Sequence, residues 1–248
     1  MALLVLLTYN KGDDTMANIV MSVLDMVTKM LQNNEPAEKI LAFLNGSTQG
    51  IRSSVLREDI IACKACTLHQ CNHTPFTGDI HSDIMFVGEA PGENEEKQGE
   101  PFVGLAGELF TRMVTVASEK LHPRWARENL YITNTIKCRP TDTKGSNRQP
   151  DLREVAACKQ ILDREIALVN PKVIICVGAI AANTLIHPDF KITQERGRFF
   201  GDQVKLISIY HPSYILRKGE DSEEGINLKT EVWQDLVLVN EYLNTLTK

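Results

Sequence analysis

The sequence predicts an α/β protein with three layers: a central four-stranded parallel sheet flanked by helices, plus an N-terminal helical extension. Four short apolar runs rich in β-formers support the sheet, and they lie at 83–88, 130–135, 172–178 and 204–210. Helical patterns separate these runs, and such alternation is typical of a parallel sheet covered on both faces. Ahead of the first run, apolar residues recur at helical spacing, which indicates the extension.

The first 50 residues are expected to form that extension. A helix is predicted over 16–32, and a second over 36–45, with Pro36 near its start and Asn-Gly at its end. The segment GSTQG at 46–50 has the composition of a linker. A third helix is predicted over 49–62, so the main domain is expected to occupy 51–248.

The remaining helices are predicted between and after the strands, at 106–121, 150–169, 179–186 and 226–246. In a parallel sheet, ligands bind beyond the carboxyl ends of the strands. The first strand ends at GEAPG, the second at Asn134 and the fourth at His211. Three strand ends therefore bring polar groups to one edge, where we expect the functional site.

The composition is that of a protein with a buried core and no membrane span. Hydrophobic residues make up 43% of the 248 residues and charged residues 24%. The apolar segment Ala2–Leu7 is short and no basic segment precedes it, so a secretory signal is not expected. Six cysteines without such a signal indicate a reducing, cytoplasmic compartment, and metal binding rather than disulfides.

The net charge of −5 argues against a nucleic-acid partner, because phosphate contacts need Lys and Arg. The distribution weakens this objection, since basic residues gather in 137–153 and 191–218 while acidic residues gather in 93–100 and 219–225. On charge alone, a mixed solvated surface is the simpler interpretation.

Four cysteines have the arrangement of metal ligands. Cys63 and Cys66 form a C-x-x-C pair, and Cys138 and Cys158 follow singly much later in the chain. Soft thiolates in that number suit either zinc or an iron–sulfur cluster, and the spacing does not choose between them. Cys71 is left over from this set. Cys176 lies in an apolar strand, where a buried free thiol is expected.

Candidate ligand-binding residues follow the first two strands. Glu89 in GEAPG could orient a water molecule or stabilise a developing cation, although a surface turn would also explain it. Phe102 in PFVG could stack on a base or simply fill the core. Asn134 could pair with the polar edge of uracil, whose donor and acceptor pattern cytosine reverses, or only cap a strand.

The segment HPSYILR at 211–217 supplies further candidates. His211 could stabilise an anionic leaving group, although a structural histidine is the simpler interpretation. Ser213 could contact a phosphate. Ile215 or Leu216 could insert into a base stack, as apolar side chains do when DNA is kinked.

The chain resembles the family 4 uracil-DNA glycosylases over about residues 55–246. The motifs that carry the resemblance occur in the family's order: the C-x-x-C pair, MFVGEAPG, GEPFVGLAG, YITNTIKCRP, NRQP, Cys158, VGAIAANTL, RGRFF and HPSYILR. The resemblance implies a 4Fe–4S cluster on Cys63, Cys66, Cys138 and Cys158, and so favours iron over zinc.

The same resemblance assigns roles to the residues of the predicted site. It implies Glu89 as the catalytic carboxylate, Phe102 as the stacking ring, Asn134 as the uracil reader and His211 as the leaving-group donor. Glu95 is expected near the C5 edge of uracil, where it would help to exclude thymine. Gly88, Ala90 and Ser213 complete the expected substrate-binding set.

The expected function is therefore a monofunctional, monomeric glycosylase of base excision repair. It would flip uracil out of single- or double-stranded DNA and hydrolyse the N-glycosidic bond, leaving an abasic site. One alternative is a superfamily protein that binds uracil-containing DNA without turnover or traps it covalently. The known trapping group uses a histidine on a basic insertion, and 139–150 contains no histidine. Another alternative is a structural zinc protein.

Overall fold

The computed structural model describes residues 14–246 and divides the chain into two compact units, Met1–Leu56 and Arg57–Lys248. The apolar segment Ala2–Leu7 and the rest of residues 1–13 lie outside the described residues. Within the part that is described, none of the helices is long and apolar enough to cross a membrane.

From residue 14 onward the first unit is helical, as the sequence predicts, but its second helix does not end at Asn-Gly. Helix α2 spans Asp14–Gln32, and α3 runs without a break over Ala37–Ile61. The predicted linker at 46–50 is therefore wrong, because these residues lie inside α3. Each of the two glycines, Gly46 and Gly50, costs about 1 kcal/mol in a helix interior, which is too little to stop a helix of 25 residues. The boundary between the two units falls after Leu56, inside α3, and the predicted domain boundary at residue 50 stays a prediction.

The second unit is built on a sheet with the strand order β1-β3-β2-β4-β5. The strands are β1 (Thr77–Gly78), β2 (Ile84–Gly88), β3 (Tyr131–Asn134), β4 (Val173–Val177) and β5 (Lys205–Ile209). The four predicted strands, β2 to β5, run parallel to one another.

The sheet is five-stranded and mixed, so the expectation of a purely parallel four-stranded sheet is wrong in that detail. The additional strand, β1, pairs antiparallel with β3 at the edge, with Thr77 opposite Ile132. Two residues have no apolar alternation, so the sequence pattern gives no signal for β1.

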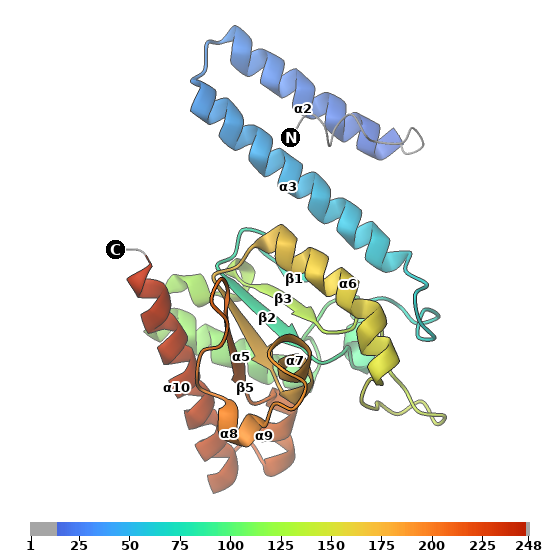
Figure 1. Ribbon diagram of the computed structural model, residues 1–248, viewed down its shortest axis with the longest axis vertical. Helices are drawn as coiled ribbons and strands as arrows, with labels where there is room; N and C mark the ends of the chain where they lie inside the picture. Colours follow the sequence, from blue (N-terminus) through green and yellow to red (C-terminus); the bar gives the residue numbers. More distant parts are fainter. Residues whose placement is uncertain (1–13, 247–248) are drawn as a thin grey trace. The chain divides into compact units, whose positions relative to one another are not determined.

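Helices cover both faces of this sheet. They are α5 (Leu105–Lys120), α6 (Leu152–Val169), α7 (Ala179–Leu185), α9 (Pro212–Lys218) and α10 (Glu223–Thr245), with the shorter α4 (Glu93–Gln98), η1 (Pro123–Trp125), η2 (Arg127–Asn129) and α8 (Ile192–Glu195). Figure 1 shows α6 and α5 on opposite sides of the strands.

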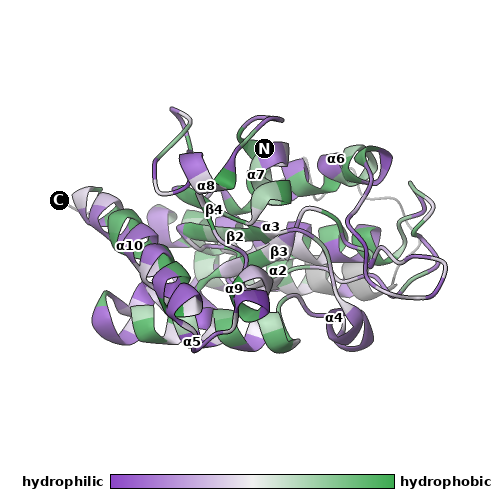
Figure 2. Ribbon diagram, turned by 90° about the horizontal axis from the view of Figure 1, so that it is seen from below, coloured by the Kyte–Doolittle hydropathy of each residue, from purple (hydrophilic) through white to green (hydrophobic). Residues whose placement is uncertain are grey.

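The core lies between the sheet and the layer formed by α5 and α10. Alternate strand residues such as Phe86, Ile132 and Ile175 are fully buried there, in one cluster with Phe110 of α5 and Val232 of α10. Both helices mix hydrophobic and hydrophilic residues along their length, as Figure 2 shows, so each buries one side and leaves the other to solvent.

The acidic segment 219–225 leads from the end of α9 into the first turn of α10. Ser222 caps the helix by accepting a hydrogen bond from the Gly225 amide, and Glu223 and Glu224 occupy the first turn. Negative charge there stabilises the positive end of the helix dipole, which gives Glu223 and Glu224 a structural role. The helix consequently begins three residues earlier than predicted.

Candidate active site

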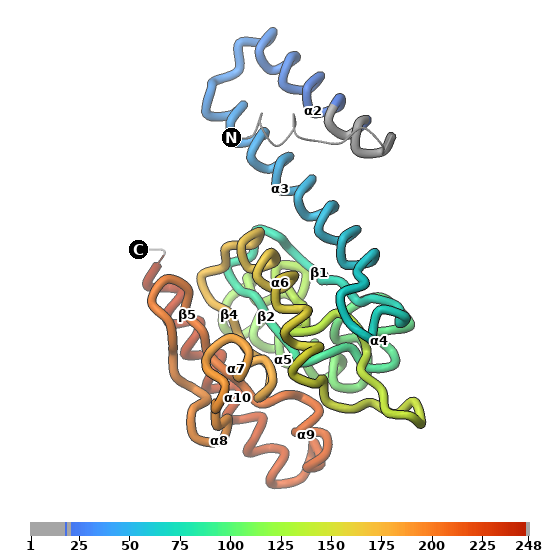
Figure 3. Tube along the Cα trace, turned by 45° about the vertical axis from the view of Figure 1, so that its right-hand side comes forward, coloured from blue at the N-terminus to red at the C-terminus, as the bar shows by residue number. Residues whose placement is uncertain are grey.

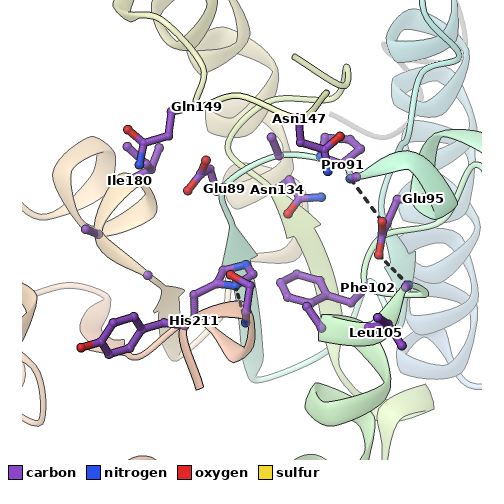
Figure 4. Close-up of a pocket in the computed structure, with 18 of the residues that line it drawn as sticks. Glu89, Pro91, Glu95, Phe102, Leu105, Asn134, Asn147, Gln149, Ile180 and His211 are labelled. Atoms are coloured by element: carbon purple, nitrogen blue, oxygen red, sulfur yellow. Dashed lines mark hydrogen bonds between the residues drawn. The ribbon is translucent and has the colours of Figure 1, made fainter. Parts of the chain in front are cut away.

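A cavity of about 770 Å³ opens at the carboxyl edge of the sheet, where the sequence predicts the site. It is lined by seven of the eight predicted catalytic and substrate-binding residues: Glu89, Ala90, Glu95, Phe102, Asn134, His211 and Ser213. Figure 4 shows Glu89, Asn134, Phe102 and His211 gathered around this space from different elements. The eighth, Gly88, ends β2 and is buried, and it does not line the cavity.

Glu89 follows β2 directly, and its carboxyl group lies in a largely desolvated part of the cavity. Burial raises the pKa of Glu89, while the positive charge of Arg217 acts in the opposite direction. A carboxylate in such surroundings interacts strongly with any cation that forms nearby, because water screens it poorly.

Asn134 ends β3, paired in register with Gly88 of β2, and is only 3% exposed. Its backbone carbonyl accepts a hydrogen bond of 2.6 Å from the Lys137 ammonium group. Lys137 is itself buried and pairs with Glu165 at 2.5 Å. The backbone of Asn134 is thus anchored by a buried residue that does not itself line the cavity.

Phe102 places its ring in the cavity wall from a strained backbone position. Its φ angle is +57°, in the left-handed region that an aromatic residue rarely adopts. The ring packs against Phe110 at a centroid distance of 4.8 Å and lies roughly parallel to the His211 ring at 5.9 Å. An aromatic ring held in this way offers a flat surface to a base.

His211 is the N-cap of α9, and its surroundings fix both its charge and its tautomer. Its Nδ1 accepts a hydrogen bond of 3.1 Å from the Ser213 amide. Burial, aided by the nearby charge of Arg217, lowers the pKa of His211 to about 4. The imidazole is therefore neutral at pH 7, with its proton on Nε2, and it can donate one hydrogen bond to a ligand.

Glu95 connects the two loops that carry Glu89 and Phe102. Its carboxylate accepts hydrogen bonds from the backbone amides of Gly92 at 3.2 Å, Val103 at 2.9 Å and Gly104 at 2.7 Å. This arrangement assigns Glu95 a role in holding the loops. Its contact with the C5 edge of uracil stays a prediction.

Several residues of the cavity wall are not among those predicted from the sequence. Arg217 lines the cavity and donates to the Ser213 hydroxyl at 3.3 Å. This contact could have been predicted from the sequence, because Ser213 and Arg217 are four residues apart and so lie on one face of a helix. The loop between β3 and α6, visible in Figure 3, adds Asn147, Arg148 and Gln149.

One of the two candidate wedge residues is unsuited to that role. Ile215 is completely buried in the hydrophobic core, so it cannot insert into a base stack without unfolding α9. Leu216 is partly buried against the same core. The wedge proposed from the sequence is therefore restricted to Leu216.

The four predicted cysteine ligands lie around one small cavity, together with His69, His73 and Lys137. They come from the loop after α3, the loop after β3 and helix α6, so segments far apart in the sequence converge here. Burial raises the pKa of Cys158, with nearby Cys66 and Cys63 adding to the effect. Four thiols with no carboxylate in the cavity wall are a donor set that fits an iron–sulfur cluster.

The thiol groups are not arranged around a single metal ion in the described part of the chain, where no three His, Cys, Asp or Glu side chains have that geometry. Cys71, which the sequence analysis set apart, forms a side-chain hydrogen bond with Cys138, and this contact raises the pKa of Cys138. Cys176 is a buried free thiol in β4, as expected.

Comparison with known proteins agrees with the resemblance. The family model described as "Uracil DNA glycosylase superfamily" matches residues 75–237. The chain belongs to this superfamily. Its matched part contains every predicted catalytic and substrate-binding residue, as well as Cys138 and Cys158, but neither α2 nor α3.

Several relatives within the superfamily are named type-4 uracil-DNA glycosylases. The chain is 40% identical to that of Archaeoglobus fulgidus over 181 residues, which are 68% of this chain and 85% of the relative. It is 38% identical to that of Thermotoga maritima, over 71% of this chain and 88% of the relative. A type-5 enzyme of Pyrobaculum aerophilum is more distant, at 25% identity over 56% of this chain and 65% of the relative.

Proposed function

We propose that this superfamily member is a uracil-DNA glycosylase of base excision repair, which releases uracil from DNA and leaves an abasic site. The observation that carries the proposal is the convergence of Glu89, Phe102, Asn134 and His211 on one cavity, each from a different segment. A base inside a duplex cannot reach such a cavity, so the nucleotide must be flipped out.

In this proposal Phe102 and Asn134 have different roles in binding the flipped base. Phe102 stacks on the flipped base, and the Asn134 amide both donates and accepts at the uracil edge. A cytosine in the same position would leave buried polar groups of the site unpaired, which is a strong basis for rejection.

Bond cleavage is assigned to Glu89 and His211. As the N-glycosidic bond breaks, positive charge develops on the sugar and negative charge on the base. Glu89 stabilises the cation and orients the attacking water. His211 donates its Nε2–H to the departing uracil, which leaves as an anion, because a neutral imidazole is a hydrogen-bond donor and a poor acid.

We further propose that Cys63, Cys66, Cys138 and Cys158 hold a 4Fe–4S cluster with a structural role. The cluster would join the loop after α3, the loop after β3 and helix α6, and so stabilise the segment that leads away from Asn134. A monomeric state and a cytoplasmic location stay predictions from the sequence.

The test is single-turnover release of uracil from a labelled duplex and from a single strand. Glu89→Gln and His211→Ala should each slow release by at least about 10²-fold, a typical loss for one transition-state contact. Glu119→Gln and His81→Ala, at exposed positions, serve as matched controls. Binding to DNA with a non-cleavable uracil analogue should change much less, because phosphate contacts dominate affinity. Near-parental release by both cavity variants would instead favour a protein that only binds uracil-containing DNA.

A further inference from the structure

The strained conformation of Phe102 needs support from outside its own segment. An aromatic residue with a φ of +57° is less stable than it would be in extended or helical conformation. Two other non-glycine residues with positive φ are described, Asn34 and Asn170, and asparagine tolerates this region well. Phe102 therefore keeps its position only if its surroundings hold the two adjoining peptide groups.

Arg127, the first residue of η2, forms hydrogen bonds with both of those peptide groups. Its Nη2 donates to the Pro101 carbonyl at 2.9 Å and to the Phe102 carbonyl at 3.1 Å. These carbonyls belong to the peptides on either side of the Phe102 Cα atom. Fixing both peptides fixes the φ and ψ angles between them, and so the direction in which the ring points.

The second peptide is also held at its other end. The Val103 amide, which shares a peptide group with the Phe102 carbonyl, donates to the Glu95 carboxylate at 2.9 Å. Helix α5 packs closely behind, because a Cβ atom on Gly107 would lie 2.0 Å from the Phe102 carbonyl carbon. The segment thus has little freedom once Arg127 is in place.

Arg127 also contacts the Phe110 ring, against which Phe102 packs. Its guanidinium group lies 5.5 Å from the centroid of the Phe110 ring, which packs on Phe102. Its Nη1 donates to the Thr111 hydroxyl at 3.3 Å. These contacts use the planar, branched donor group of arginine, which the single ammonium group of lysine cannot reproduce.

We infer that Arg127 is a positioning residue that holds Phe102 as the stacking surface and thereby sets capture of the flipped base rather than bond cleavage. This inference rests on the proposed function and assigns a residue that neither the sequence motifs nor the superfamily match singles out.

The test is a double-mutant cycle between Arg127 and Phe102 under single-turnover conditions. Arg127→Met should raise the enzyme concentration for half-maximal uracil release by about 5- to 150-fold, the range expected for loss of base stacking, with the maximal rate changed less than about threefold. Phe102→Ala should have a similar effect. In the Phe102→Ala background, Arg127→Met should then cause less than about a twofold further change, because its effect passes through the ring.

The controls separate positioning from general stability and from failure of the proposed function. Arg112→Met removes an arginine of α5 that pairs with Glu220 on the surface and should leave capture unchanged. The enzyme concentration for half-maximal uracil release by Arg127→Lys should fall between those of the parent and Arg127→Met. If the methionine variant does not fold, Arg127→Lys replaces it in the double-mutant cycle. A full additional loss in the Phe102→Ala background, or parental capture by Arg127→Met, would overturn the inference. Absence of uracil release by the parent would overturn the proposed function instead.

Discussion

Gly88 and Asn134 stand side by side at the ends of β2 and β3, so close that a side chain at position 88 would collide with the asparagine. A Cβ atom on Gly88 would lie 2.3 Å from the Asn134 Oδ1 and 2.7 Å from the Phe102 Cζ. The substrate-binding role of Gly88 stays a prediction. The absence of a side chain at this position leaves the space that Asn134 and Phe102 occupy.

Gly88→Ala should therefore impair capture of uracil without unfolding the protein. The added methyl group must displace the Asn134 amide, the Phe102 ring or both, since real Cβ atoms do not approach so closely. We expect at least about a tenfold loss in uracil release at limiting enzyme, measured beside the thermal midpoint. Gly50→Ala in α3 is the control, because the space around that position is open. Parental release by Gly88→Ala would show that the contact is unimportant.

Asn134→Asp should reduce discrimination between uracil and cytosine. A carboxylate can accept a hydrogen bond but cannot donate one to the uracil carbonyl unless it is protonated. The hydrogen bond to that carbonyl is therefore lost, and the carboxylate and carbonyl oxygens repel each other. The measurement is the ratio of single-turnover release rates from uracil- and cytosine-containing strands. An unchanged ratio with parental rates would exclude Asn134 as the reader.

Cys138→Ser should lose iron and soluble yield together, because metal binding and folding are coupled in such sites. Cys71→Ser is the matched control, since Cys71 contacts Cys138 but is not among the predicted ligands. The two variants should be compared by iron content and by absorbance near about 400 nm after purification. Full iron in Cys138→Ser, or equal loss in Cys71→Ser, would contradict the assignment.

The buried pair of Lys137 and Glu165 should be costly to break and less costly to replace. Glu165→Leu leaves the Lys137 ammonium group without its counter-ion at a site that is 1% exposed, and should lower the free energy of unfolding by about 3–5 kcal/mol. The double variant Lys137→Met/Glu165→Leu should recover part of that loss. Chemical denaturation of the three proteins, with iron content checked in parallel, gives the comparison. A double variant less stable than Glu165→Leu alone would refute this account.

The pKa of His211 predicts a pH dependence of stability with a definite sign. The folded value is about 4 and the ordinary value 6.5, so the unfolded chain takes up the proton first as the pH falls. This residue should therefore lower the free energy of unfolding progressively from pH 6.5 to pH 4, by up to about 3 kcal/mol. His211→Gln should show a shallower slope over this range in urea denaturation, whereas His81→Gln should match the parent. Equal slopes for all three would place His211 in a more hydrated site.

The strands could be predicted because each parallel strand is a short apolar run with recognisable ends. Their polar end residues, Glu89, Asn134 and His211, follow from the same pattern, since parallel strands finish at one edge. Helix α3 was divided wrongly because Gly46 and Gly50 resemble a linker, while the cooperativity of a long helix outweighs their local cost.

Residues that act through backbone contacts had no comparable signal. Arg127 meets the Phe102 carbonyl across 25 positions of sequence, and Glu95 meets the Val103 amide across eight. A hydrogen bond to a carbonyl or amide group places no requirement on the residue type at the other end. The sequence pattern can therefore identify the ring and miss the residue that holds it.

The distribution of the cysteines along the chain has a consequence for synthesis. Cys63 and Cys66 emerge from the ribosome first, Cys138 follows, and α6 with Cys158 comes last. At about 5–20 residues per second, the first pair waits on the order of 5–20 s for the fourth thiol. A cluster on all four thiols can thus be completed only after β1, β2 and β3 have been translated, while β4 and β5 follow Cys158 in the chain. During that interval the early thiols are open to oxidation or to binding of another metal. Delivery of iron to all four thiols would have to follow the translation of residue 158.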